Sequence, residues 1–581
     1  MVNLIIDGKN ISVPEGTTVL AAAGQNGIDI PTLCFLKDIN EVGDCRMCIV
    51  EIEGRRGFVA SCIEKVQEGM VVKTHTPEVI EARKMMLDLI LSNHHKDCLT
   101  CIRDGNCELQ NLAKKFNIKK INYEGVINEH EVDDKSPSIV RDFNKCVLCR
   151  RCVATCKNVQ GIGAIDCAGR GFDSCISTTY NCSLNDVDCT LCGQCIESCP
   201  TGALHEKENI DDVWNALNNE DKYVVVQTAP AVRVALGEEF GMDIGTNVTG
   251  KMVTALKELG FNKVFDTNTG ADLTIMEEAN EFIERLQNGG ALPMITSCSP
   301  GWIRFAEKNY PENLPHLSSC KSPHQMFGAI VKSYYANKFN VPKEKICMVS
   351  IMPCVAKKYE STREEMEVDG VRDVDFVLTT RELARMIKQA NIDFTNLEDS
   401  TFDDPMGEAS GAGAIFGTTG GVMEAAIRTA VDTLEGRSID KLNYTEVRGE
   451  KEIKEATLNI AGTEVRIAVA SGLANARKIM EQIKNGNCPY HFVEIMACPG
   501  GCIMGGGQPI KSSKIRATID VAGLRKSALY SIDEASTIRK SHENPVMKVL
   551  YDEFLEKPGS HVAHKYLHTT YSAKPKYDMP E

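Results

Sequence analysis

The sequence has no run of about 18 apolar residues, the length that a membrane-spanning helix needs. Its first residues lack the basic region, apolar region and cleavage site of a secretory signal, so we expect a cytoplasmic protein. Basic residues are also in deficit: 65 Lys and Arg against 80 Asp and Glu give a net charge of −15. A nucleic-acid binder needs a basic face. We therefore expect neither a membrane nor a nucleic-acid partner.

Complete nucleotide-binding fingerprints are missing as well. The segment 245–251 has P-loop spacing, but Met252 follows where a P-loop has the Ser or Thr that binds Mg²⁺. The segment 411–417 has one residue too many for a GxGxxG turn. We interpret these glycines as turn or packing residues and expect no NAD, FAD or ATP site in this chain.

Cysteine, by contrast, is abundant. The 581 residues contain 25 cysteines, most of them closely spaced before residue 200. The length predicts three or four domains, and thiols that stay reduced in a cytoplasm favour metal ligation over disulfides. The spacings then indicate which metal groups are bound.

The first group is Cys34, Cys45, Cys48 and Cys62, which follows an apparent hairpin with an Asp7-Gly8 turn. The long first spacing, the CxxC pair and the distant fourth cysteine resemble the cysteine arrangement of plant-type ferredoxins, although the spacings differ. We predict a [2Fe–2S] cluster here, with structural zinc as the alternative, because zinc sites favour two CxxC pairs.

The second group follows an apparent helix, PEVIEARKMMLDLILSN, and consists of His94, Cys98, Cys101 and Cys107. Imidazole and three thiolates suit zinc. From the residues alone, zinc and an iron–sulfur cluster are equally favoured.

The third group is two copies of C-x2-C-x2-C-x3-C, which predict two [4Fe–4S] clusters. In such modules the fourth cysteine of each run binds the other cluster. One set is thus Cys146, Cys149, Cys152 and Cys199. The other set is Cys189, Cys192, Cys195 and Cys156. A row of clusters only relays electrons, so the chemistry must lie in the residues after Cys199.

The remaining sequence has an α/β pattern. Apolar segments that read as strands end in cysteines at 291–302, 343–354 and 491–502. Open α/β folds place their sites at the ends of strands, so we expect these cysteines to belong to one site.

Three segments carry a family resemblance: TSCSPGW (296–302), MPCVAKK (352–358) and EIMACPGGCIMGGGQP (494–509). They resemble the signature segments of [FeFe]-hydrogenases, and the order of the N-terminal clusters resembles the clostridial type. The implied fold is multidomain α+β, with ferredoxin-like Fe–S modules before a large α/β H-cluster domain. The expected parts are a β-grasp [2Fe–2S] domain at 1–78, a small helical [4Fe–4S] module with one histidine and three cysteine ligands at 79–125, a bacterial 2[4Fe–4S] ferredoxin domain at 138–208 and the catalytic domain at 209–581.

The resemblance also implies cofactors. The His94 group would bind a third accessory [4Fe–4S] cluster. The H-cluster, a [4Fe–4S] cubane joined to a two-iron unit with CO, cyanide and azadithiolate, would use Cys354, Cys498 and Cys502, with Cys502 as the bridge. Lys357 would donate to a cyanide. The residues that would line the pocket are Pro230, Met352, Phe416 and Met496.

A proton route is implied too. It would start at Cys298 and pass Glu278, Ser318 and Glu281 to Arg285. Glu278 and Glu281 are three residues apart, so they share a face of a helix.

One position departs from the family. The pattern TSCCPGW has a relay cysteine followed by a cubane ligand, and this sequence has Ser299 in the second place. Three interpretations remain: Ser299 as an alkoxide ligand, Cys298 as the ligand after a shifted turn, or a weakened site. A serine ligand is harder and more basic than thiolate, which would lower the cubane potential.

By this resemblance the protein is an anaerobic, oxygen-sensitive enzyme that interconverts 2H⁺ + 2e⁻ and H₂. Its expected partners are ferredoxin or flavodoxin, and maturation proteins that build the H-cluster. Two alternatives differ in setting or class. One is the catalytic subunit of an electron-bifurcating hydrogenase, whose flavin and NAD(P) sites lie in other subunits. The other is a non-catalytic, hydrogenase-like electron-transfer protein.

Overall fold

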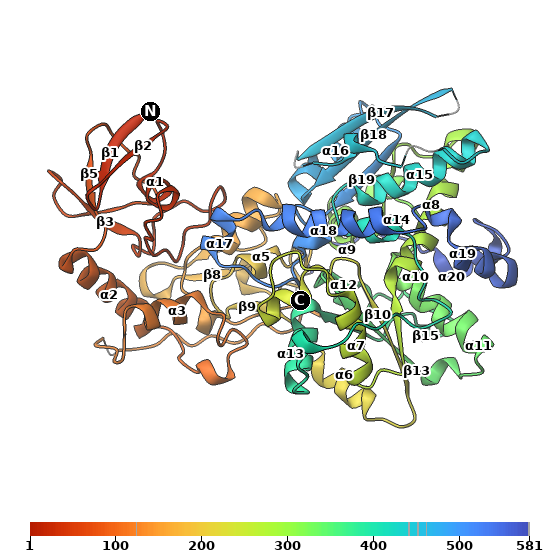
Figure 1. Ribbon diagram of the computed structural model, residues 1–581, viewed down its shortest axis with the longest axis horizontal. Coiled ribbons are helices and arrows are strands. Elements are labelled where there is room, and N and C mark those ends of the chain that lie inside the picture. The colour runs from red at the N-terminus through yellow and green to blue at the C-terminus, as the bar shows by residue number, and fades with distance from the viewer. Residues whose placement is uncertain (124, 440–441, 450–451, 461, 579–581) are drawn as a thin grey trace.

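The computed structural model describes residues 1–123, 125–439, 442–449, 452–460 and 462–578. Parts of the expected 79–125 and 209–581 domains therefore lie outside the described residues. The N-terminal modules lie at one end of an elongated molecule, and the larger α/β part forms the other end (Figure 1).

The first module is a five-stranded sheet in the order β2-β1-β5-β3-β4. Its strands are β1 (Val2–Ile6), β2 (Lys9–Val13), β3 (Ile49–Ile52), β4 (Phe58–Ala60) and β5 (Val71–Lys73), with helix α1 (Val19–Gln25) beside them. Asp7 and Gly8 have φ of 48° and 79°, which a two-residue hairpin turn requires. This confirms the predicted hairpin.

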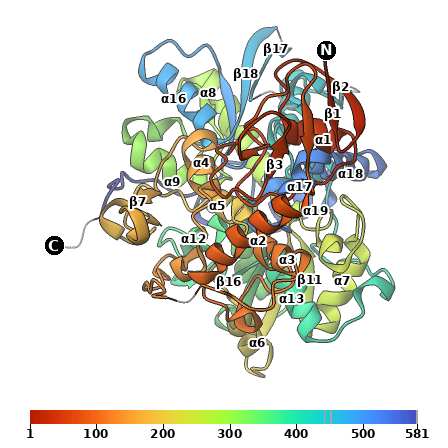
Figure 2. The same cartoon turned by 90° about the vertical axis from the view of Figure 1, so that its left-hand side faces the viewer.

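A small helical module follows. Helix α2 (Pro77–Ser92) starts at the cap Thr76, whose hydroxyl accepts from the Val79 amide. Helix α3 (Glu108–Lys115) packs its Leu109 and Leu112 against Leu87 of α2. Both helices lie on the side of the first sheet away from the N-terminus (Figure 2).

A ferredoxin-like module comes next. Strand β6 (Ile139–Arg141) pairs antiparallel with β9 (Leu204–Glu206), and β7 (Asp166–Ala168) pairs with β8 (Cys175–Ser177). Two short helices, α4 (Arg151–Ala154) and α5 (Gln194–Ser198), carry part of each cysteine run.

The α/β part contains two four-stranded sheets. The first has the order β11-β10-β13-β16 and is entirely parallel. Its strands are β10 (Tyr223–Thr228), β11 (Lys263–Asp266), β13 (Ile346–Met352) and β16 (Phe376–Thr379). The second has the order β12-β19-β18-β17, with strands β12 (Met294–Ile295), β17 (Ile453–Ile460), β18 (Thr463–Ser471) and β19 (Phe492–Met496). A small hairpin joins β14 (Glu367–Val368) to β15 (Val371–Arg372).

Helices surround both sheets. Helix α8 (Thr267–Asn288) begins directly after β11 and contacts α10 (Pro323–Ile330), α14 (Gly411–Ile415) and α15 (Gly421–Glu435). The other helices are α6 (Ile210–Leu217), α7 (Thr249–Glu258), α9 (Pro300–Asn309), α11 (Ala336–Lys338), α12 (Ala356–Glu360), α13 (Thr380–Gln389), α16 (Leu473–Lys484), α17 (Ser513–Thr518), α18 (Val521–Ala535), α19 (Pro545–Leu550) and α20 (His561–Leu567).

None of the described helices is both long enough and apolar enough to span a bilayer.

Candidate active site

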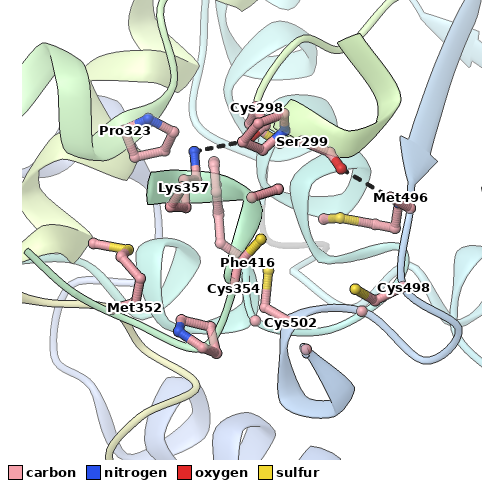
Figure 3. A pocket seen from close by; sticks show the side chains of 18 of the residues that line it. Cys298, Ser299, Pro323, Met352, Cys354, Lys357, Phe416, Met496, Cys498 and Cys502 are labelled. Atoms are coloured by element: carbon pink, nitrogen blue, oxygen red, sulfur yellow. Dashed lines mark hydrogen bonds between the residues drawn. The ribbon is translucent and has the colours of Figure 1, made fainter. Parts of the chain in front are cut away.

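A cavity of about 90 Å³ lies between the two sheets of the α/β part. Strands β13, β12 and β19 all end at it, and the residues just after them, Cys354, Cys298 and Cys498, line it together with Cys502. Their side chains surround one space in Figure 3. The pocket residues implied by the resemblance also line it: Pro230, Met352, Phe416 and Met496.

Backbone without side chains forms part of the wall. A Cβ added at Gly501 would lie 2.6 Å from the Thr419 amide nitrogen, and one at Gly505 would lie 2.2 Å from the Pro353 carbonyl oxygen. Any other residue at these positions would push the Cys502 loop away from its neighbours. The loop is therefore held close to the cavity by its glycines.

Three cysteine thiols and a largely apolar wall fit a sulfur-ligated iron cofactor such as the H-cluster, because thiolates are the usual ligands of iron–sulfur clusters. Burial raises the pKa of Cys354 and raises the pKa of Cys502 to about 12. Buried thiols with raised pKa favour being neutral unless a cation binds them. The donor set and its burial thus match a bound cluster.

Ser299 also lines the cavity, at the N-terminus of α9. Its hydroxyl accepts a hydrogen bond from the Ala497 amide at 3.3 Å (Figure 3). This places the Ser299 oxygen on the cavity wall beside β19, on the same wall as Cys498.

Lys357 enters the cavity from α12. Its Nζ donates to the Cys298 carbonyl at 3.0 Å and to the Glu360 carboxylate at 2.8 Å. Glu360 also accepts from Ser322 at 2.8 Å and contacts His324. These bonds aim Lys357 at the space between the cysteines.

Glu360 and His324 are not among the site residues predicted from the sequence. Burial raises the pKa of Glu360, but Lys357 and His324 outweigh it and hold this pKa at about 2. Burial, with Lys357, lowers the pKa of His324 to about 4. The available signal was the i,i+3 spacing of Lys357 and Glu360 on one helix; His324 had none, because only the fold brings it there.

Three of the proposed proton-route residues, Ser318, Glu281 and Arg285, are joined by hydrogen bonds. Ser318 donates to Glu281 at 2.9 Å, and Arg285 donates to the other Glu281 oxygen at 2.6 Å. Glu278, on the same face of α8, is fully buried, and burial followed by the nearby Glu281 raises its pKa to about 8. Burial, then the charge of Glu278, raises the pKa of Cys298 well above its ordinary value.

Neither carboxylate oxygen of Glu278 has a hydrogen-bond partner of ordinary geometry among the described residues, although Ser318 and the Ser297 backbone lie near enough to lower its pKa slightly. Buried polar groups are usually hydrogen-bonded, so an unpartnered buried carboxyl calls for an explanation other than a structural role.

The eight cysteines of the two C-x2-C-x2-C-x3-C runs line two separate cavities of about 30 Å³ each. One cavity is lined by Cys146, Cys149, Cys152 and Cys199. The other is lined by Cys156, Cys189, Cys192 and Cys195. The structure thus brings the cysteines together in the crossed sets that the spacing predicts.

Cys192 lines both its own cavity and the catalytic one. Close glycine packing brings the two parts together: a Cβ on Gly506 would lie 2.7 Å from the Gly193 Cα. The second ferredoxin-like cavity therefore adjoins the candidate active site.

The other two groups differ in how deeply their ligands are buried. Cys34, Cys48 and Cys62 are buried, and the Cys34 amide donates to Cys45 Sγ at 3.3 Å. His94 is buried with a free Nδ1, and burial, with Lys145, lowers its pKa to about 4, whereas Cys98 is exposed.

Ligand spacing bears on the zinc alternative. The described groups whose three ligand atoms lie within 4.8 Å of one another do not include the His94 group. A single zinc ion needs its ligands about 4 Å apart, so the wider spacing suits a cluster.

Comparisons with known proteins agree with this geometry. Residues 222–506 match the family described as iron only hydrogenase large subunit, C-terminal domain, and 519–574 match iron hydrogenase small subunit. Residues 1–77 match a 2Fe-2S iron-sulfur cluster binding domain. Residues 83–122 match the NADH-ubiquinone oxidoreductase-G iron-sulfur binding region, and 136–205 match the ferredoxin-like domain of NADH-quinone oxidoreductase subunit 3.

Individual relatives cover nearly the whole chain. The NADP-reducing hydrogenase subunit HndD of Solidesulfovibrio fructosivorans is 49% identical over 98% of this chain and 99% of its own. Iron hydrogenase 1 of Clostridium pasteurianum is 44% identical over 98% of this chain and 100% of its own. A solved structure of the [FeFe]-hydrogenase HydA1 of Chlamydomonas reinhardtii, 42% identical, covers 63% of this chain and 99% of its own with a TM-score of 0.57.

The chain therefore belongs to the iron-only, or [FeFe], hydrogenases. It is an enzyme of that class, with 2Fe–2S and 4Fe–4S cluster-binding domains ahead of an H-cluster domain.

Proposed function

We propose that the residues around the cavity form the catalytic machinery for reversible H₂ formation, with the accessory clusters supplying electrons. The observation that carries this proposal is that Cys354, Cys498 and Cys502 line one cavity. Cys298, the proposed proton relay, lines the same cavity, and so does Cys192 of the second ferredoxin-like cysteine set.

Cys354, Cys498 and Cys502 would hold the H-cluster, and Cys502 would also hold its two-iron unit. When bound, this cofactor supplies the redox-active iron at which H₂ is formed or split. Lys357, fixed by Glu360 and His324, donates a hydrogen bond into the cavity and orients the group it contacts. The apolar side chains of Met352, Phe416 and Met496 exclude water.

Protons move through the chain's own side chains. Cys298 lies at the cavity wall, Glu278 carries a proton because its pKa is near 8, and Ser318 passes it to Glu281. Arg285 holds Glu281 in place at the outer end of the route. A carboxyl whose pKa lies close to neutral can both accept and release a proton.

Ser299 is the proposed fourth cubane ligand, through its oxygen. It already stands at the cavity wall while Cys298 keeps the relay position, so no shifted turn is needed. A harder oxygen ligand would lower the cubane potential.

Electrons enter through the N-terminal modules and reach the cavity at Cys192. In a protein of net charge −15, the segment 79–125 has eight basic and six acidic residues, a net charge of +2. Lys114, Lys119 and Lys120 of this segment are exposed. This local charge suits an acidic carrier such as ferredoxin or flavodoxin.

Replacing Lys119 and Lys120 with Glu should raise the KM for ferredoxin more than the KM for methyl viologen. An equal change in both KM values would contradict docking of ferredoxin at these lysines.

A multisubunit setting is supported by a different observation. The relative HndD is named as a subunit of an NADP-reducing hydrogenase, and the regions matching residues 83–122 and 136–205 are named for NADH oxidoreductases. We propose that NAD(P)-linked flavin subunits bind the N-terminal modules in the cytoplasm, where thiols stay reduced. Maturation proteins would install the two-iron unit. Co-purification of a flavoprotein would support this setting, and full activity of the lone chain with ferredoxin would count against it.

Infrared spectroscopy on anaerobically matured protein tests the catalytic proposal. We expect stretching bands of CO and cyanide together with H₂ evolution. Absence of these bands when maturation proteins are present would overturn the proposal and favour the non-catalytic electron-transfer alternative.

A further inference from the structure

A second group of metal-type ligands lies at the outer end of the proton route. One ligand atom each of Glu281, Cys320 and His568 lies within 4.8 Å of the others. Glu281 belongs to α8, Cys320 to the loop before α10, and His568 follows α20. Thiolate, imidazole and carboxylate together form a donor set that suits Zn²⁺.

The backbone fixes two of these ligands relative to each other. Cys320 and His568 pair as an isolated antiparallel bridge, and the Lys321 amide donates to the Leu567 carbonyl at 2.8 Å. The Cys320 sulfur lies 3.9 Å from Glu281 Oε2. The three side chains are thus brought together by regular main-chain contacts rather than by free surface motion.

The His568 ring is oriented as zinc-binding imidazoles are. Its Nε2 lies 3.0 Å from Glu277, a carboxylate that is only 1% exposed. Glu277 also accepts from the Tyr551 hydroxyl and from the Gly559 amide. A carboxylate that accepts from one ring nitrogen leaves the lone pair of the other free for a metal. Among the described residues, the hydrogen-bond partner of that other nitrogen, Nδ1, is a rotatable hydroxyl, Ser319 Oγ, at 2.7 Å.

The charges around the site favour a cation. Burial, followed by the carboxylates of Glu281, Glu278 and Glu277, raises the pKa of Cys320 well above its ordinary value. A dication would offset these same charges. Arg285 opposes binding, but it donates to Glu281 Oε1, whereas Oε2 accepts from the neutral Ser318 hydroxyl and Ser319 amide. The His564 ring lies next to the His568 ring, with centroids 4.0 Å apart and planes tilted by 35°.

We propose that Glu281, Cys320 and His568 bind one Zn²⁺ ion and that this ion closes the proton route. Zn–S, Zn–N and Zn–O bonds form, the thiol proton of Cys320 leaves to solvent, and no group changes oxidation state. Ser319 or a water completes a tetrahedral site. The ion closes the route because Glu281 Oε2 becomes a metal ligand and can no longer take a proton from Ser318, which donates to this oxygen in the structure. Only this closure rests on the proton route proposed above.

The test uses the matured holoenzyme, titrated anaerobically with ZnCl₂. Zinc X-ray absorption should show one sulfur and several nitrogen or oxygen ligands, and H₂ evolution should fall as the site fills. Mg²⁺ should have no effect, because it prefers oxygen ligands. In Cys320→Ser the sulfur ligand should be lost.

Cys320→Ser and His568→Asn should each raise the half-inhibitory zinc concentration by about tenfold or more, as expected for the loss of one of three protein ligands. Glu277→Gln, which removes only the outer partner of His568, should weaken binding by about 10- to 100-fold. Matched controls are His542→Asn, in the other group of close ligands, and Cys488→Ser, a half-buried thiol elsewhere. Both should behave as wild type.

Several results would overturn the proposal. A zinc spectrum without sulfur, or inhibition that is unchanged in all three variants, would show that the ion binds elsewhere. Zinc bound with one sulfur but without inhibition would disprove the closure. An enzyme that makes no H₂ before zinc is added would instead mark a failure of the proposed catalytic function, so the two failures are distinguishable.

Discussion

The ferredoxin-like module and the catalytic cavity both gather sulfur ligands, but they do so over very different lengths of chain. The module takes eight cysteines from residues 146–199, mostly three or four positions apart. The proposed ligands that line the cavity, Ser299, Cys354, Cys498 and Cys502, are placed by strands of two separate sheets. A relay needs only a local loop around each cluster, whereas a reaction centre has to be enclosed, dry and connected to a proton route. The difference therefore follows the chemistry of each region.

Removing one proposed ligand from each region should have the largest effects and should show that the two regions have different roles. Cys502→Ala should abolish H₂ evolution and the CO and cyanide bands, while the electron paramagnetic resonance signals of the accessory clusters remain. Cys149→Ala should do the reverse, keeping the infrared bands and reducing electron delivery from ferredoxin. If Cys149→Ala also removed the bands, the two regions would not be independent.

Blocking the proton route should have the next largest effect. Glu278→Gln keeps the shape of the side chain but cannot carry a proton, so turnover should fall by roughly 10²-fold or more. Infrared bands and iron content should match wild type. Activity within a few-fold of wild type would exclude Glu278 from the route.

The same residue makes a prediction for stability. Its folded pKa of about 8 lies above the ordinary value of 4.5, so the folded state binds the proton more tightly. The stability of the wild type should therefore fall as the pH rises from about 4.5 to 8, relative to Glu278→Gln, by an amount on the order of a few kcal/mol. Thermal melts of both proteins at several pH values measure this. A difference between them that does not depend on pH would contradict the raised pKa.

The smallest expected effect is at the position where the cavity departs from its family. Ser299→Cys should raise the cubane potential and change H₂ evolution by a few-fold, because thiolate is a softer ligand than serine oxygen. Redox titration followed by infrared spectroscopy measures the potential, and an H₂ assay measures the rate. An unchanged potential would show that residue 299 is not a ligand.

Local sequence was sufficient wherever a short segment builds its own structure. The Asp7-Gly8 turn, the helix after Thr76 and the crossed cysteine sets all follow from spacing within a few residues, since turns, caps and cluster loops close on themselves. The signature segments also contain Cys354, Cys498 and Cys502, which line one cavity in the structure.

What only the tertiary structure decided is how distant segments meet. The strands that end in cysteines belong to two sheets, and the cavity lies between them. His324 and Glu360 meet beside Lys357, and His568 reaches Cys320 from the C-terminal segment. These contacts join residues tens to hundreds of positions apart. They arise from the burial of sheets and helices against one another, which leaves no short-range pattern in the sequence.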